Sequence, residues 1–274
     1  MPMGTAKSQE VLRKNNVTVA GNVRAAGTLV FVHGFGTDQT AWEAVTPAFA
    51  ADWRLVLLDN VGAGASDPAA FVESRYHDLE KYADDLLDIA DVLELEKATL
   101  VGHSVGGMVG ILAANRAPEV FGKLVLIGVS PRYLQDTDYP GNMSNTDVRD
   151  VYEAIRNDHL EWAMNYSLLA LQNPERPELS ESFAKTLWKI PTERVLTVLH
   201  SILQMDFRSE LPRVSVPTLI IQSREDAFVP LAVAEYMHNT IRGSRLQVID
   251  AFGHLPHISA PAAVTAAMQD FLRP

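Results

Sequence analysis

The segment that most constrains the fold of this 274-residue chain is the pentapeptide Gly-His-Ser-Val-Gly at residues 102–106. It follows an apolar run at 98–101 and precedes a segment of helical composition. Between a strand and a helix, this pattern is typical of a strained turn that lifts a serine hydroxyl clear of a sheet and directs the next backbone N–H at a reacting oxygen. The simpler alternative is a tight turn without chemistry. The context favours a nucleophilic serine, Ser104.

Short apolar runs recur along the chain and predict strands that are covered on both faces. Helical patterns separate these runs, and this alternation predicts an α/β protein with a mostly parallel, twisted sheet flanked by helices. A further run at 16–20 predicts an antiparallel edge strand. The six predicted strands of the main sheet are 28–32, 54–59, 99–101, 123–129, 218–222 and 246–249.

One helix is especially clear, because apolar residues recur every three or four positions between Leu79 and Leu93. This stripe predicts a buried helix face. The opposite face carries four aspartates, which we expect to be solvated: Asp84, Asp85, Asp88 and Asp91.

The strand-helix alternation stops between about Pro131 and Leu211, where prolines separate four helical patterns. A helical insertion between two sheet-forming parts is best explained as a cap over the carboxyl edge of the sheet, where open α/β folds bind ligands. We therefore expect a single domain with a core at 1–130 and 212–274 and a cap at 131–211. The four predicted cap helices are 147–156, 160–171, 179–188 and 192–204.

Composition excludes several classes of function. The net charge of −11 and the pI near 5.1 argue against a nucleic-acid surface, which needs clustered lysine and arginine. The absence of cysteine excludes disulfides and thiolate metal sites. The eight histidines lack metal-binding spacings, so we expect no metal and no cofactor. With no signal-peptide pattern and no apolar run long enough to span a membrane, we expect a cytoplasmic protein without membrane contact.

A serine nucleophile needs a base, and that base needs a carboxylate to orient it. His254 lies just beyond the last predicted strand, and Asp226 lies just beyond the strand before it. Both positions fall at the carboxyl edge of a parallel sheet, beside Ser104. We therefore predict that His254 takes the Ser104 proton and that Asp226 fixes the imidazole. The rivals are His257 for the base, and Glu225 and Asp206 for the acid.

Acyl transfer also needs hydrogen-bond donors for the oxyanion. One predicted donor is the backbone N–H of Val105. The second is the backbone N–H of Phe35, in the glycine-containing loop that follows the 28–32 strand. The alternative is that these glycines only mark a turn. We expect His33 to order this loop and His103 to line the floor of the substrate pocket.

The predicted cap is rich in aromatic and aliphatic residues. Most of them can be explained by packing of the cap helices on one another, but a cap that covers Ser104 must also present some of them to the cavity. This favours a compact apolar ligand with one reactive carbonyl. The residues are Tyr133, Trp162, Tyr166, Leu168, Leu169, Leu171, Trp188, Ile202 and Leu203.

Several motifs together resemble the RsbQ-type α/β-hydrolases, which include the bacterial stress regulator RsbQ and the plant karrikin and strigolactone receptors. The resemblance covers nearly the whole chain and rests on the segments 33–39 with Trp42, 59–64, 102–105, 130–133 and 253–256. It implies an α/β-hydrolase fold with a Ser104-Asp226-His254 triad under a four-helix, V-shaped cap. It also implies that six residues line a substrate pocket: Phe35, Tyr166, Leu169, Trp188, Leu203 and Ala227. The cap composition adds Tyr133 to this set.

We therefore expect a serine hydrolase that cleaves a small apolar, butenolide-like ester or lactone through an acyl-enzyme. The resemblance implies an alternative: a signalling regulator with little turnover that activates a partner protein, in bacteria a PAS-domain phosphatase. Perhydrolysis and C–C bond hydrolysis are further serine chemistries. Tyr166 and Trp188 stand where the plant receptors tend to carry phenylalanine, so the pocket should differ from theirs in volume and polarity.

Overall fold

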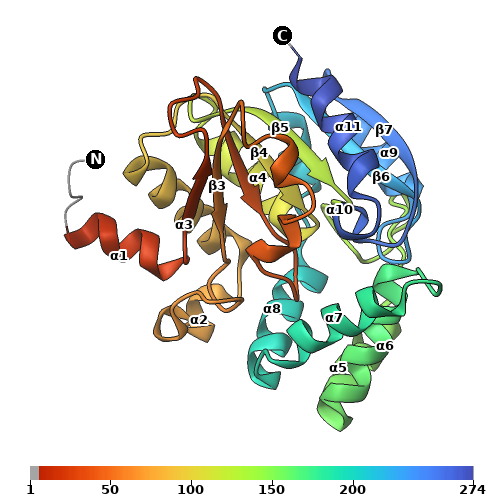
Figure 1. The fold of residues 1–274 in the computed structure, drawn as a ribbon. Coiled ribbons are helices and arrows are strands. Elements are labelled where there is room, and N and C mark those ends of the chain that lie inside the picture. The colour runs from red at the N-terminus through yellow and green to blue at the C-terminus, as the bar shows by residue number, and fades with distance from the viewer. Residues whose placement is uncertain (1–5, 274) are drawn as a thin grey trace.

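The computed structural model describes residues 6–273, and these contain a seven-stranded sheet in the order β1-β3-β2-β4-β5-β6-β7 (Figure 1). Strand β1 pairs antiparallel with β3, and every other pairing is parallel. The predicted α/β class and the antiparallel edge strand are both confirmed. The strands are β1 (Thr18–Gly21), β2 (Thr28–Val32), β3 (Arg54–Leu58), β4 (Ala98–His103), β5 (Phe121–Ile127), β6 (Thr218–Glu225) and β7 (Arg245–Phe252).

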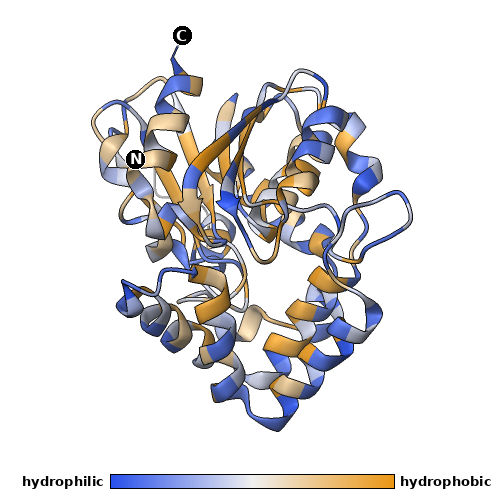
Figure 2. Ribbon diagram, turned by 90° about the vertical axis from the view of Figure 1, so that its right-hand side faces the viewer, coloured by the Kyte–Doolittle hydropathy of each residue, from blue (hydrophilic) through white to orange (hydrophobic). Residues whose placement is uncertain are grey.

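Helices cover both faces of the sheet. Helices α3 (Leu79–Val92), α4 (Val105–Arg116) and α9 (Leu231–Thr240) pack on one face, and α11 (Pro261–Leu272) packs on the other. Successive side chains of a strand point to opposite faces, so β2 sends Val30 and Val32 into one core and its other apolar residues into the second. Figure 2 shows the resulting hydrophobic interior between more polar outer surfaces.

The acidic face of α3 is only partly solvated. Asp85 is buried, because helix α1 (Ala6–Lys14), which the sequence analysis did not predict, brings Lys14 to within 2.8 Å of its carboxylate. Lys81 lies 3.0 Å away, and the Tyr76 hydroxyl, from helix α2 (Glu73–Tyr76), donates a hydrogen bond of 2.7 Å. The prediction was therefore wrong for Asp85, which is a paired internal charge. The other three aspartates are exposed.

Between β5 and β6 the chain forms four helices, which lie together beyond one edge of the sheet (Figure 1). Their ends differ from the predicted ones by at most two residues. Local signals set these ends: Ser144 and Asp147 form a capping box, Asp158 caps the next helix, and Pro177 occupies a first-turn position. The helices are α5 (Asn145–Asn157), α6 (His159–Leu171), α7 (Pro177–Trp188) and α8 (Thr192–Gln204).

All four helices fall inside 131–211, the range predicted for the cap. Residues 1–5 and 274, which the prediction assigned to the core, lie outside the described residues. From residue 6 to residue 273, no helix is long and apolar enough to cross a membrane. A short helix, α10 (Pro256–Ser259), follows β7 and completes the carboxyl edge of the sheet.

Candidate active site

Ser104 occupies the sharp turn between β4 and α4. Its backbone angles are φ 51° and ψ −127°, in a region that residues other than glycine rarely adopt. The flanking glycines have no side chain, so neighbouring backbone segments can approach the serine turn closely. A Cβ at Gly106 would lie 2.4 Å from the carbonyl oxygen of His33, and one at Gly102 would lie 2.4 Å from the Cα of Gly107. Larger residues at either position would push the serine turn away from its neighbours.

The predicted triad side chains form one continuous hydrogen-bonded chain. The Ser104 hydroxyl lies 2.8 Å from His254 Nε2, where it can donate, and His254 Nδ1 lies 2.8 Å from Asp226 Oδ2. The three residues follow strands β4, β7 and β6, whose carboxyl ends meet at one edge of the sheet. All three are shielded from bulk water: Ser104 is 6% exposed, and the side chains of His254 and Asp226 are 6% and 1% exposed. This is the geometry of a serine activated by an oriented imidazole.

Asp226 is held in place by its own loop. The backbone N–H groups of Phe228 and Val229 donate to its Oδ1 at 2.8 and 3.0 Å, and Gln222 donates to its Oδ2 at 3.2 Å. These donors and the imidazole together supply four hydrogen bonds to a buried carboxylate. These four hydrogen bonds fix the orientation of the carboxylate and therefore the orientation of the His254 ring beside it.

The rival acids lie elsewhere. Glu225 is exposed at the end of β6. Asp206 pairs with Arg208 and Arg132 at 2.7 and 2.6 Å, and the hydrogen bonds from Arg208 and Arg132 lower its pKa to about 2. Asp206 thus links the cap to the loop after β5. Neither rival has a hydrogen bond to His254.

The rival base, His257, is fully buried beneath the triad. Its ring centroid lies 4.6 Å from that of Trp42 and 4.3 Å from that of His103. Neither ring nitrogen has a hydrogen-bond partner among residues 6–273, and burial lowers the pKa of His257 to about 3. The residue is therefore a neutral packing element without contact to the serine hydroxyl.

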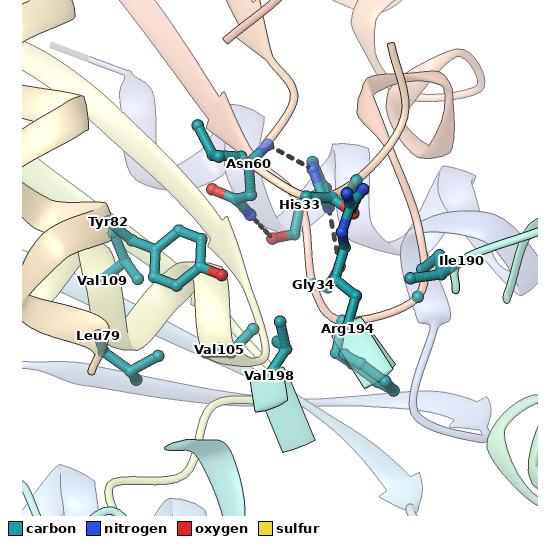
Figure 3. Close-up of a pocket in the computed structure, with 15 residues that line it drawn as sticks. His33, Gly34, Asn60, Leu79, Tyr82, Val105, Val109, Ile190, Arg194 and Val198 are labelled. Atoms are coloured by element: carbon teal, nitrogen blue, oxygen red, sulfur yellow. Dashed lines mark hydrogen bonds between the residues drawn. The ribbon is translucent and has the colours of Figure 1, made fainter. Parts of the chain in front are cut away.

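The loop after β2 and the start of α4 each bring one unused backbone donor beside Ser104. Within the described part of the chain, the N–H groups of Phe35 and Val105 donate to no acceptor. His33 orders this loop: its Nδ1 donates to the Gly34 carbonyl at 2.8 Å, and its Nε2 accepts from the backbone N–H of Asn60 at 2.9 Å (Figure 3). Burial lowers the pKa of His33 and keeps this neutral tautomer. The arrangement can present two donors to an oxyanion.

A cavity of about 350 Å³ opens onto Ser104 and His254 between the sheet edge and the cap. This volume suits a small ligand. Six of the residues predicted to bind substrate line it: Phe35, Tyr133, Tyr166, Leu169, Leu203 and Ala227. Trp162 and Ile202, from the set of apolar cap residues of which some were expected to face the cavity, also line it. Six further lining residues had no predicted pocket role: Asn142, Met143, Val151, Asn165, Leu199 and Phe228.

Helical spacing could have found two of these six residues. Asn165 lies four residues before Leu169 on α6. On α8, Leu199 lies four residues before Leu203. The remaining missed residues, except Val151, lie in loops, where no periodicity reveals which side chain turns inward.

Polar groups are few in this cavity. The Tyr133 hydroxyl lies 3.4 Å from Ser104 Oγ, and burial raises the pKa of Tyr133, so this hydroxyl stays protonated. Burial also raises the pKa of Tyr166, whose ring stacks on Phe228 at a centroid distance of 4.7 Å. The Asn142 side chain is engaged with the carbonyl of Ala227 at 2.7 Å. The cavity therefore offers apolar surface with hydroxyl groups near the serine.

Two predicted pocket residues lie outside this cavity. Trp188, the last residue of α7, is 52% exposed and faces outward, because its neighbour Leu187 takes the buried position. His103 precedes Ser104 on β4, and alternation along the strand directs it away from the cavity. Its Nε2 donates to the His254 carbonyl at 2.8 Å, and burial among histidines lowers its pKa well below the usual value. His103 thus supports the loop that carries His254.

Metal chemistry has no evident donor set. Among residues 6–273, no three histidine, cysteine, aspartate or glutamate side chains form a group that could hold a metal ion. The buried histidines have other contacts. His33 bonds within the loop after β2, His254 bonds Asp226, and His103 and His257 pack beneath them.

A parallel sheet with a serine turn and a hydrogen-bonded Ser-His-Asp chain under a helical insertion defines the class of α/β hydrolases. The chain matches the family described as alpha/beta hydrolase fold over residues 27–261, and it belongs to that family.

Two plant proteins and one solved structure are similar to this chain over most of its length. The chain is 39% identical to the Karrikin insensitive 2 receptor CA of Petunia hybrida, over 90% of this chain and 94% of that one. It is 40% identical to the Strigolactone esterase D14 of Arabidopsis thaliana, over 92% and 96% of the two chains. Among solved structures it is similar to the hydrolase olei00960 from Oleispira antarctica, with a TM-score of 0.93, 27% identity and 96% of each chain covered.

Proposed function

We propose that this protein is a serine hydrolase that cleaves a small apolar, butenolide-like ester or lactone. The observation that carries the proposal is the hydrogen-bonded chain from Asp226 through His254 to Ser104, which opens onto an apolar cavity. The similarity to a strigolactone esterase supports ester chemistry. Under this proposal, the cap selects the ligand and the sheet edge performs the reaction.

The geometry supports a two-step mechanism. His254 Nε2 takes the Ser104 proton as the serine oxygen attacks the carbonyl carbon, and the backbone N–H groups of Phe35 and Val105 stabilise the oxyanion. The C–O bond then breaks, and the imidazolium returns its proton to the leaving alkoxide. In the second step, His254 deprotonates a water that attacks the acyl-enzyme, and Ser104 recovers its proton as the acid leaves. Asp226 stabilises the charged imidazole in both steps.

Hydrolysis of short p-nitrophenyl esters and of a model butenolide tests this proposal. The unaltered protein should hydrolyse them, and the Ser104→Ala variant should lose at least about 10³-fold in kcat because it lacks the nucleophile. A matched control is Ser201→Ala, which removes a buried serine on α8 that does not line the cavity. Equal activity of the Ser104→Ala variant and the unaltered protein would remove the proposal.

A second candidate function is that of a signalling regulator that activates a partner protein. It is favoured by large apolar side chains on the outer surface of the cap: Leu160, Met164 and Leu168 follow one line of α6, and Trp188 lies on α7, each between 46% and 58% exposed. Exposed apolar side chains gathered on one surface are typical of interaction sites. The relatives include a protein named as a receptor.

The two functions can be separated by one surface substitution. Leu168→Glu places a charge on the cap surface without altering the cavity lining. A regulator should lose its ability to activate a PAS-domain phosphatase while keeping ester hydrolysis. A phosphatase whose activity is unchanged by the unaltered protein, with and without a butenolide, would count against the second function alone.

A further inference from the structure

A second, smaller cavity lies beside the loop that follows β2 and carries Phe35 (Figure 3). Phe35 lines both cavities, but Ser104 and His254 line only the larger one. The smaller cavity measures about 40 Å³. A water needs at least about 10–15 Å³ measured in this way, so the space accepts about three water-sized groups. It is therefore a separate compartment, sized for a fragment of a few heavy atoms.

Most of the surface of this cavity is apolar. Leu79 comes from α3, Val105 and Val109 come from α4, and the cap contributes Ile190 and Val198. The cavity thus lies where the core meets α8 of the cap. Its walls favour a hydrocarbon group over a fully hydrated ion.

One polar group that points into this space is the hydroxyl of Tyr82. Tyr82 is 6% exposed, and its hydroxyl has no hydrogen-bond partner within residues 6–273. Figure 3 shows the hydroxyl directed toward the centre of the cavity. Burial is the main cause that raises the pKa of Tyr82, so the group stays protonated and can donate. An unsatisfied donor of this kind is expected to meet an acceptor.

The second polar group is the guanidinium of Arg194. Its Nη1 donates to the Gly62 carbonyl at 3.4 Å, and its central carbon lies 4.7 Å from the centre of the Phe71 ring. No carboxylate in the described part of the chain pairs with it, although the protein carries a net charge of −11. Its positive charge also acts on Tyr82. Arg194 and Tyr82 therefore present hydrogen-bond donors, suited to a carboxylate acceptor, around one apolar space.

We propose that this cavity binds a short aliphatic monocarboxylate, of about two or three carbons from the volume available, between Arg194 and Tyr82. The carboxylate accepts from the guanidinium and the phenol, and the alkyl chain contacts Val105, Val109 and Val198. An inorganic anion would leave the apolar walls unfilled. The bound acid lies against Phe35 and Val105, whose N–H groups border Ser104. This site does not depend on the proposed ester hydrolysis.

Methyl NMR of the full chain titrated with propionate tests the site. The Ser104→Ala variant is used, so that the result stands whether or not the protein is a hydrolase. We expect saturable shifts at Val105, Val109 and Val198 without matching shifts at Ile202 and Leu203, which line the larger cavity. Propionamide, which keeps the alkyl chain without the charge, should bind at least tenfold more weakly. Shifts confined to the larger cavity, or equal binding of propionamide, would overturn the proposal.

Variants then test the two donors. Arg194→Gln should weaken propionate binding at least tenfold, and Tyr82→Phe should weaken it about threefold, as expected for one lost neutral hydrogen bond. The control is Arg149→Gln, on the exposed surface of α5, where the side chain bonds only Thr146. Equal affinity in the Arg194→Gln and Arg149→Gln proteins would refute the role of Arg194. The propionamide comparison decides the question even if a substitution unfolds the chain.

Discussion

The sheet edge and the cap of this protein are held together by different interactions. At the sheet edge, buried polar atoms bond one another, and Asp226 alone accepts four hydrogen bonds. In the cap, apolar side chains line the cavity, and several large ones remain exposed on the outside. Directional bonds fix atoms, whereas apolar packing fixes volume and shape. Substitutions at the sheet edge should therefore change the chemical step, and those in the cap should change stability or ligand choice.

The largest effect is expected from Asp226→Asn. An amide that turns its NH₂ toward His254 favours the wrong imidazole tautomer, and kcat/KM for p-nitrophenyl acetate should fall about 10⁴-fold. Glu225→Gln is the matched control, because that carboxylate is adjacent in sequence but exposed. Steady-state kinetics on both variants decide the matter. A loss of similar size in the Glu225→Gln protein would show that the geometry does not identify the acid.

Two tryptophans of the cap separate packing from surface exposure. Trp162 is 7% exposed and lines the cavity, whereas Trp188 is 52% exposed. Trp162→Ala should lower the free energy of unfolding by about 3–5 kcal/mol through the lost burial and the cavity created. Trp188→Ala should lower it by less than about 1 kcal/mol. Urea denaturation of both variants measures the difference, and equal losses would contradict the assignment of Trp188 to the outer surface.

Ligand choice should respond to the volume of the larger cavity. Leu203→Trp adds bulk to the lining, so KM for a naphthyl ester should rise about tenfold while kcat for an acetate ester changes less than about twofold. Leu168→Trp makes the same exchange on the outside of α6, where the side chain is 58% exposed, and should leave both parameters unchanged. A uniform fall in kcat for all esters in the Leu203→Trp protein would show that the cap also shapes the chemistry.

A smaller effect than that of Trp162→Ala is expected in the pH dependence of stability. His257 is buried, and its pKa in the folded protein is about 3, below the value of 6.5 in an unfolded chain. Above pH 6.5 the residue is neutral in both states and has no effect. As the pH falls from 6.5 toward 3, only the unfolded chain takes up its proton, so the free energy of unfolding declines by up to about 1.4 kcal/mol per pH unit.

Removing this histidine should flatten the decline. Urea denaturation between pH 6.5 and 4.5 should show a shallower loss of stability in the His257→Leu protein than in the unaltered one. His200→Leu, on the exposed side of the cap, is the comparison and should keep the original slope. Identical slopes in all three proteins would mean that His257 is hydrated in the folded state.

Much of the fold could be predicted because its signals are local. Strand 28–32 and helix 192–204 were predicted with their observed ends, since apolar runs, prolines and caps mark them. Asp85 was placed on a solvated face because its partner Lys14 lies on a helix that was not predicted. A buried charge is recognised only when both partners are known.

The site residues that could be predicted from the sequence are those whose positions the backbone determines. The strand ends place Ser104, Asp226 and His254 at one edge whatever the details of packing. The direction of the Trp188 side chain depends on the rotation of α7 about its axis. Neighbouring helices set this rotation, and the sequence of α7 alone does not. Tyr82 and Arg194 line one cavity from segments more than a hundred residues apart, and no local pattern relates them.

The central claim is that Ser104 is a nucleophile activated through His254, and covalent labelling tests it most directly. The protein is treated with phenylmethanesulfonyl fluoride, and the modified peptide is identified by mass spectrometry. We expect one sulfonyl group on Ser104, and labelling at least 10²-fold slower in the His254→Gln protein because the base is lost. Labelling at another residue, or an unchanged rate without His254, would contradict the account.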